Sequence, residues 1–176
     1  DITRGSLTPL PVAVSPLHVE SNSSEILQEI EIGSEISKII ETNLLRSGLF
    51  NPLEKDSFVQ KPDIAHLKPR FEDWKLIKAQ ALITGKVEII DKNLRVEFRL
   101  WDVLAAKEML AIAFTTVPTN WRRVGHIITD KVYERLTGEK GYFDTRLIYV
   151  AEEGPKTKRI KKLAIMDQDG FNLKYL

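Results

Sequence analysis

The chain has 176 residues, 43% of them hydrophobic and 29% charged, and its 26 basic and 25 acidic side chains leave a formal net charge of +1. This composition is ordinary for a globular domain, and the balanced charge gives no general electrostatic reason to bind nucleic acid or an anionic membrane. The absence of cysteine excludes disulfides and thiolate sites, and no stretch is apolar for the roughly 20 residues that a membrane-spanning helix needs.

The first 50 residues predict a polar arm, a short strand, a loop and a helix. Residues 1–9, DITRGSLTP, are polar and are expected to form a flexible arm. Alternating residues between two prolines predict a short strand near 12–15, and HVESNSSE (18–25) is expected to be a loop. A helix that ends at Gly48 is predicted by residues recurring at helical spacing, namely Ile32, Ile36, Ile39, Ile40 and Leu44.

The middle of the chain carries the strongest β signal. Phe50-Asn51-Pro52-Leu53 is expected to turn the chain sharply, residues 60–70 to form a loop, and residues 71–79 to form a short helix. Three strands are predicted after that, at 80–91, 94–103 and 108–117. The first two strands are joined by the tight turn Asp91-Lys92-Asn93, and strict alternation in the second predicts an antiparallel strand with one buried face.

A second long helix and three short strands complete the chain. Thr119 is a candidate N-cap of this helix and Gly138 its end. Its apolar stripe is Trp121, Val124, Ile128, Val132 and Leu136. The predicted fold is α/β, an open sandwich of a mixed sheet with two long helices on one face, over residues 10–145. Residues 146–176 contain predicted strands and tight turns but no helix, which predicts a boundary near Arg146.

The sequence contains no recognisable pattern of a nucleophile, a histidine and an acid that would form a catalytic site. The three histidines, His18, His66 and His126, lack a nucleophile elbow, and the expectation for each is a solvated or locally hydrogen-bonded side chain. No metal-binding histidine spacing occurs. DQDG (167–170) resembles the start of a calcium loop but lacks the terminal glutamate, so a β-turn is favoured. The sequence therefore predicts no catalytic residue, no metal ligand and no cofactor.

Two surface features leave more than one interpretation. The basic run Lys156 to Lys162 fits either an anion-binding patch or, as we favour, a solvated turn whose charges pair with Glu152 and Glu153. Trp101 lies on the polar face of its predicted strand, which fits either a stacking surface for bases or packing against a segment outside the sheet.

Several stretches, in the right order along the chain, resemble the TolB amino-terminal domain family. They are LLRSGLFNPLEKD (44–56), ALITGKV (81–87), NWRRVGHIITDKVYERLTGEKGYFDTRLIYV (120–150) and IMDQDGFN (165–172). The third is the strongest, because it resembles the family's W-x-x-x-G-H helix, its L-T-G-x-x-G turn and its F-x-T-R-I-x-Y-V strand. The last resembles the D-x-D-G-x-N turn of a propeller blade.

The resemblance implies a periplasmic, non-catalytic adaptor of the Tol–Pal envelope system, which supports envelope integrity and cell division. It implies an anticodon-binding-domain-like α/β domain at 10–145, and at 146–176 a linker strand and the truncated first blade of a β-propeller. It further implies that an amino-terminal arm binds inner-membrane TolA, and the corresponding residues here are Asp1, Ile2, Thr3, Arg4, Gly5 and Ser6. The propeller of the family binds outer-membrane Pal in a manner coupled to the state of the arm, and colicins are further candidate partners.

Two other functions stay open on the sequence. An RNA- or anticodon-binding-like module is suggested by the implied architecture, although the net charge near zero argues against it. A propeller-type hydrolase would need a catalytic domain beyond Leu176. The start at Asp1 fits either a removed leader or a trimmed sequence. A partial blade would lack its neighbours, so we expect residues 146–176 to be poorly ordered, docked on the α/β domain, or paired with another copy.

Overall fold

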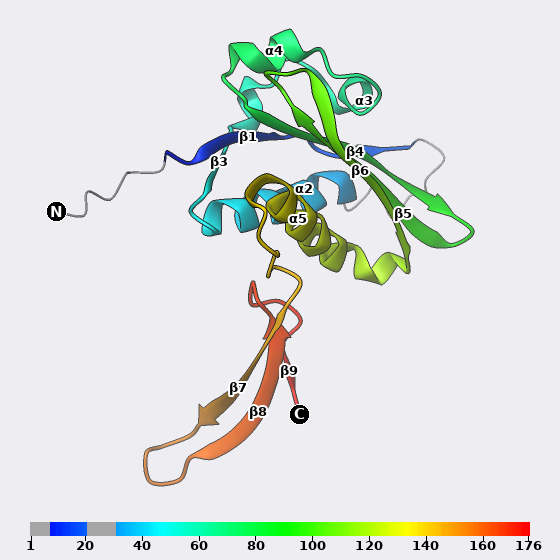
Figure 1. Cartoon of the computed structure of the whole chain (residues 1–176). Helices are drawn as coiled ribbons and strands as arrows, with labels where there is room; N and C mark the ends of the chain where they lie inside the picture. Colours follow the sequence, from blue (N-terminus) through cyan, green and yellow to red (C-terminus); the bar gives the residue numbers. More distant parts are fainter. Residues whose placement is uncertain (1–7, 21–30) are drawn as a thin grey trace, which may run out of the picture.

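The computed structural model of the protein describes residues 8–20 and 31–176. A larger α/β part lies above a narrow sheet that projects away from it (Figure 1). The expected arm residues Asp1 to Ser6 lie outside the described residues, as does most of the expected loop at 18–25. The elements, in chain order, are β1 (Leu10–Val14), β2 (His18–Val19), α2 (Ile32–Arg46), β3 (Phe50–Pro52), α3 (Pro62–Ala65), α4 (Phe71–Leu76), β4 (Ala81–Ile90), β5 (Asn93–Asp102), β6 (Lys107–Thr116), α5 (Trp121–Thr137), β7 (Arg146–Glu153), β8 (Ile160–Asp167) and β9 (Lys174–Tyr175).

The larger sheet is mixed, as the sequence predicts. Its strand order is β3-β1-β4-β5-β6, with β2 also paired to β4. β1 runs parallel to both β3 and β4, whereas β4, β5 and β6 form an antiparallel meander. The turn between β4 and β5 places Asp91 and Lys92 at φ of 49° and 65°, the left-handed values that a tight hairpin turn of this kind requires.

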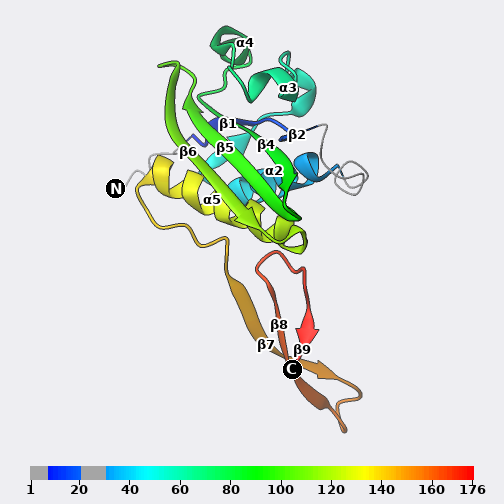
Figure 2. The same cartoon turned by 90° about the vertical axis from the view of Figure 1, so that its right-hand side faces the viewer.

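The two long helices cover one face of this sheet, which confirms the predicted sandwich (Figure 2). Their buried side chains pack on the apolar faces of β1, β4 and β5, and alternate β5 residues from Leu94 to Leu100 are fully buried. The helices approach closely at Gly125, where a Cβ would lie only 2.9 Å from Cγ2 of Ile39 on α2. Gly138 ends α5 with φ of 79°, as predicted for a left-handed cap.

A smaller apolar cluster lies on the opposite face, beneath the segment that carries α3 and α4. Trp74 of α4 is buried at its centre, and its Nε1 donates a hydrogen bond to Oε1 of Gln60 over 3.0 Å. Trp101 of β5 packs edge-on against the ring of Phe71, with centroids 5.7 Å apart, and donates through Nε1 to Oγ1 of Thr84. Trp101 therefore packs on a segment outside the sheet, one of its two predicted interpretations, and is not a free stacking surface.

Four local expectations are wrong. The expected loop at 18–25 begins with strand β2, and the expected turn at 50–53 contains strand β3, because both segments pair in parallel with partners distant in the sequence. The expected loop at 60–70 contains α3, a single turn of helix. Thr119 is not the N-cap of α5, because it lies in a 3-10 turn, Pro118–Asn120, and the helix starts after Asn120 with no side-chain cap.

The second sheet has the order β7-β8-β9 and is antiparallel. The predicted last strand is short, since only Lys174–Tyr175 pair with β8. Large apolar side chains of this sheet are exposed, among them Ile148, Val150 and Leu163. The sheet contacts the α/β part through the turn that joins β8 to β9, which is one of the three outcomes expected from the sequence. Within the described ranges, no helix combines the length and the apolarity that crossing a membrane requires.

Candidate functional site at the helix–turn junction

Polar side chains from distant segments of the chain meet where α2 and α5 contact the β8–β9 turn. We call this region the junction and define it by Asn43 of α2, Arg122 and His126 of α5, and Gln168 and Asp169 of the turn. Figure 1 shows the turn at the upper end of the projecting sheet, directly below the two helices. Two stretches that resemble family motifs, WRRVGH and DQDGFN, thus lie side by side although 47 residues separate Arg122 from Asp169.

The DQDG segment is a β-turn, as favoured over a calcium loop. The amide of Gly170 donates to the carbonyl of Asp167 over 2.9 Å, and Gly170 has a φ of 90° that suits glycine. The Asp167 amide donates in turn to the carbonyl of Phe171 over 2.8 Å. Both carboxylates of the turn are engaged by the protein, Asp167 by the side chain of Asn172 and Asp169 by α5. The turn therefore presents a fixed carboxylate to the helices.

Arg122 and Asp169 form the charged contact of the junction. The Arg122 Nη2 atom lies 2.6 Å from Oδ2 of Asp169, and the side chains are only 18% and 12% exposed. The same guanidinium lies over the ring of Phe171, 3.7 Å from its centroid. A charge-assisted hydrogen bond with little access to water is stronger than a surface ion pair, so this contact favours one position of the turn on α5.

A buried amide connects the two helices with the turn. Asn43, which is 1% exposed, donates through Nδ2 to Nδ1 of His126 over 2.9 Å and to Oγ1 of Thr129 over 3.2 Å. Its Oδ1 accepts a hydrogen bond from Nε2 of Gln168 over 2.9 Å. Thr129 can accept because its own hydroxyl donates to the carbonyl of Gly125. The side-chain amide of Asn43 therefore donates to α5 and accepts from the turn, so that α2, α5 and the turn belong to one hydrogen-bond network.

The same network assigns the tautomer of His126. Because Nδ1 accepts from Asn43, the proton of a neutral ring lies on Nε2, which is 3.3 Å from Oδ2 of Asp169. Burial lowers the pKa of His126, with Arg122 acting in the same direction and the Asp169 carboxylate opposing it. The net direction is downward from 6.5, so the neutral ring is favoured near pH 7.

The segment between α5 and β7 is also fixed by α5. Asp130 accepts hydrogen bonds from the amides of Phe143 and Asp144, over 2.6 and 3.1 Å. This close approach needs glycine at 141, because a Cβ there would lie 2.4 Å from Oδ1 of Asp130. Arg123 then holds the Asp144 carboxylate with Nε and Nη2. The connection to the second sheet is therefore bound to the helix and does not behave as a free linker.

The sequence missed the role of His126, which was expected to lie off the apolar stripe as a solvated or locally bonded side chain. The ring is 2% exposed and its partner is Asn43, 83 residues earlier. A signal for it existed, since Asn43 is spaced three residues from Ile40 and seven from Ile36, on the buried face of α2. A polar residue at such a position needs a buried partner.

The other candidate residues fall into three groups. His18 and His66, expected as separate loop residues, stack on each other with ring centroids 4.6 Å apart. The basic run at 156–162 forms the favoured solvated turn, in which Glu152 pairs with Arg159 and Lys161, and Glu153 with Lys162. The candidate TolA-binding residues Asp1, Ile2, Thr3, Arg4, Gly5 and Ser6 are outside the part of the chain that the structure describes.

Comparisons with known proteins agree with this architecture. A family model described as the TolB amino-terminal domain matches residues 1–109. The Tol-Pal system protein TolB of Pelagibacter ubique (strain HTCC1062) is 76% identical over 180 residues, which cover 100% of this chain and 40% of that protein. The chain therefore spans 40% of the length of this curated relative.

Two solved structures share the fold. The crystal structure of TolB from Acinetobacter baumannii superposes with a TM-score of 0.76 at 24% identity, covering 96% of this chain and 38% of that one. The hypothetical protein CT253 from Chlamydia trachomatis superposes with a TM-score of 0.54 at 12% identity, covering 75% of this chain and 100% of that one. At these identities, the likeness concerns the fold alone.

Proposed function

This chain belongs to the TolB amino-terminal domain family, and from that premise we propose that it acts as a non-catalytic adaptor of the Tol–Pal system in the periplasm. In this role, residues 1–6 bind TolA, and a β-propeller that begins within residues 146–176 binds Pal. The protein thereby links the inner and outer membranes and supports envelope integrity and cell division. Colicins are further candidate ligands of the same surfaces.

The observation that carries the proposal is the junction. Arg122, Asn43 and His126 direct their polar atoms at the β8–β9 turn, and these contacts are made within the chain. Such contacts stabilise one orientation of two structural units relative to each other. A hydrogen-bond and salt-bridge network between two units is one physical route by which binding at one unit can affect binding at the other.

The second sheet supports the propeller part of the proposal. One blade of a propeller has about four strands and is covered by its neighbours. Here β7, β8 and β9 leave apolar side chains uncovered, including Ile148, Val150 and Leu163. The length of the Pelagibacter relative, of which this chain covers 40%, is compatible with further blades. We therefore assign residues 10–145 to the α/β domain and residues 146–176 to the start of the propeller.

The test is a binding assay on the protein expressed from its complete gene, against the soluble domains of Pal and TolA. We expect low-micromolar or tighter binding to each. Replacement of residues 1–6 by a Gly-Ser sequence of equal length should abolish binding to TolA and retain binding to Pal. Absence of Pal binding at low micromolar concentration would refute the adaptor role, and unchanged TolA binding by the replaced variant would refute the assignment of the arm.

A further inference from the structure

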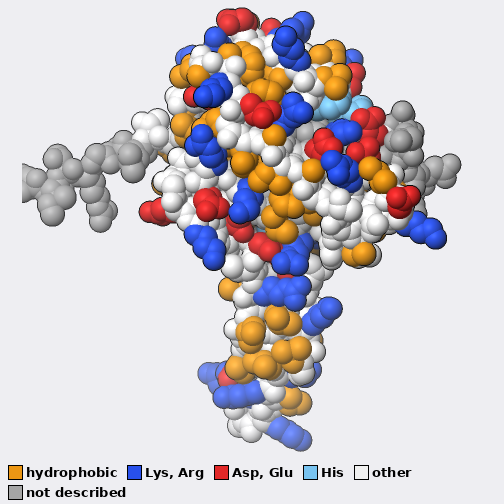
Figure 3. Space-filling model, turned by 45° about the vertical axis from the view of Figure 1, so that its right-hand side comes forward, with side chains coloured by type: hydrophobic (Ala, Val, Ile, Leu, Met, Phe, Trp, Pro, Cys, Tyr) orange, Lys and Arg blue, Asp and Glu red, His pale blue; other side chains and the backbone are white. Residues whose placement is uncertain are grey.

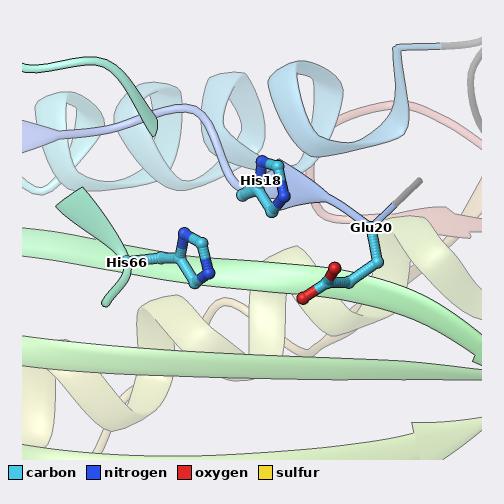
Figure 4. Close-up of side chains that lie close together, drawn as sticks. All are labelled: His18, Glu20 and His66. Carbon is cyan, nitrogen blue, oxygen red and sulfur yellow. The ribbon is translucent and has the colours of Figure 1, made fainter. Parts of the chain in front are cut away.

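We propose that His18, Glu20 and His66 form a binding site for a zinc ion on the face of the α/β domain opposite the long helices. Their ligand atoms, two imidazole nitrogens and a carboxylate oxygen, all lie within 4.8 Å of one another. Figure 4 shows the three side chains turned toward a shared space between two segments. The site is separate from the junction and does not rest on the proposed function.

Two of the ligands come from one extended segment with a fixed register. His18 pairs with Lys86 and Val19 with Val87 in the parallel ladder between β2 and β4, and the amide of Glu20 donates to the carbonyl of Val87 over 3.0 Å. Residues two apart on an extended strand direct their side chains to the same face. The pairing with β4 therefore holds the His18 ring and the Glu20 carboxylate side by side.

The third ligand comes from the end of α3 and is held in a defined tautomer. The Nδ1 atom of His66 lies 3.0 Å from the carbonyl oxygen of Pro62, which can only accept a hydrogen bond. Nδ1 therefore carries a proton, and in the neutral ring Nε2 keeps its lone pair for a metal. A histidine whose other nitrogen donates to a backbone carbonyl is the usual arrangement of a metal ligand.

The geometry indicates how the site must close. The His18 and His66 rings are stacked, with centroids 4.6 Å apart and an angle of 8° between their planes. Two ligands of a tetrahedral zinc ion at 2.0–2.1 Å are about 3.3 Å apart, so the cluster must contract by about 1 Å or more and the rings must tilt out of the stack. All three side chains are partly exposed, which leaves room for this adjustment.

The surrounding charges set a cost for binding. The cluster borders an open pocket of about 190 Å³ whose lining includes Lys86, Glu97 and Arg99. The Lys86 ammonium lies 3.6 Å from the Glu20 carboxylate and 3.3 Å from Glu88, so it can leave the first acid for the second. Figure 3 shows pale blue histidine side chains on a face where acidic and basic side chains gather beside them. A cation therefore displaces Lys86 from Glu20.

The ligand set favours zinc over harder ions. Two imidazoles and one carboxylate are typical of zinc sites with three protein ligands and a water molecule, whereas magnesium and calcium prefer oxygen ligands. The bound ion would connect β2 with the segment that carries α3, so its effect is to fix two parts of one surface. No reaction at the ion is proposed.

The test combines calorimetry with a spectroscopic readout. Zinc sulfate is titrated into metal-stripped protein, and cobalt(II) is added to a second sample to follow the visible absorption of a tetrahedral site. We expect one ion per chain, and a loss of affinity of about tenfold or more in His18→Ala, His66→Ala and Glu20→Gln. Lys86→Gln should instead bind more tightly, because the competing ammonium is gone. Glu72→Gln, an exposed acid of α4 with an 84% exposed side chain, is the matched control.

Nuclear magnetic resonance of the histidine rings keeps the test decisive if a variant fails to fold. In the unmodified protein, zinc should shift the ring signals of His18 and His66 and leave those of His126 in place. Equal zinc affinity in the unmodified protein and the His18→Ala variant would overturn the proposal. Zinc that shifts none of the rings, or that binds only above about 1 mM, would also overturn it.

Discussion

Replacing Asn43 by alanine should destabilise the protein far more than its small change in size suggests. The substitution removes the donor to Nδ1 of His126 and the donor to Oγ1 of Thr129, both of which are buried. An ordinary hydrogen bond contributes about 1 kcal/mol, and a buried group left without a partner costs about 1–3 kcal/mol. Nδ1 of His126 is left buried without a partner, which costs about 1–3 kcal/mol, whereas Thr129 loses one of its two hydrogen bonds, worth about 1 kcal/mol. The expected decrease in the free energy of unfolding is therefore about 2–4 kcal/mol. The third bond, to Gln168, adds little because water can replace it.

The assay is urea unfolding followed by tryptophan fluorescence, since the three tryptophans all lie in the α/β part. The midpoint should fall while the slope stays constant, as for a change in stability without a change in the surface exposed on unfolding. Asn51→Ala is the matched control, because Asn51 is exposed in β3 and should change the free energy of unfolding by less than about 0.5 kcal/mol. An equally small loss for Asn43→Ala would refute the buried network.

Two further predictions concern the charged groups of the junction. Because the folded-state pKa of His126 is lowered from 6.5, the unfolded state binds its proton more readily, and this contribution to stability is present above about pH 6.5 and is lost as the pH falls toward the folded pKa. Thermal melts should therefore show a stability that decreases below pH 6.5 by up to about 1.4 kcal/mol per pH unit, and His126→Asn should weaken this dependence. Parallel pH profiles for the two proteins would contradict the assignment of the pH dependence to His126. A double-mutant cycle with Arg122→Ala and Asp169→Ala should give a coupling energy of about 1–3 kcal/mol at low salt, and additive single effects would show that the ion pair does not act.

The parts of the fold that the sequence predicted are those with a strong local pattern. Alternation from Leu94 to Leu100 identified β5, and the apolar stripe ending at Gly138 identified α5. β2 and β3 were missed because two or three residues carry no periodicity, and both strands exist through parallel pairing with β4 and β1. Propensity describes such segments poorly, since the tertiary partner decides their conformation.

The candidate sites show the same limit more sharply. His126 and Asn43 are 83 residues apart. His18 and His66 meet because β2 pairs with β4 and α3 also contacts β4. Spacing motifs detect metal ligands that lie close together in the sequence, on one helix or one loop. They do not detect a site in which two ligands, His18 and Glu20, come from one strand segment and the third, His66, comes from a distant turn. The stretches that resemble family motifs include Arg122, His126, Gln168 and Asp169 but not Asn43, and the contact between Arg122 and Asp169 required the structure.

The central claim is that the α/β domain and the C-terminal sheet are joined at the junction. Nuclear magnetic relaxation of backbone ¹⁵N nuclei tests it directly, because two units that move together share one rotational correlation time. We predict that amides of β8 report the same correlation time as those of β4 and β5, and that Arg122→Ala shortens it for β8 alone. A shorter correlation time for β8 in the unmodified protein would contradict the claim.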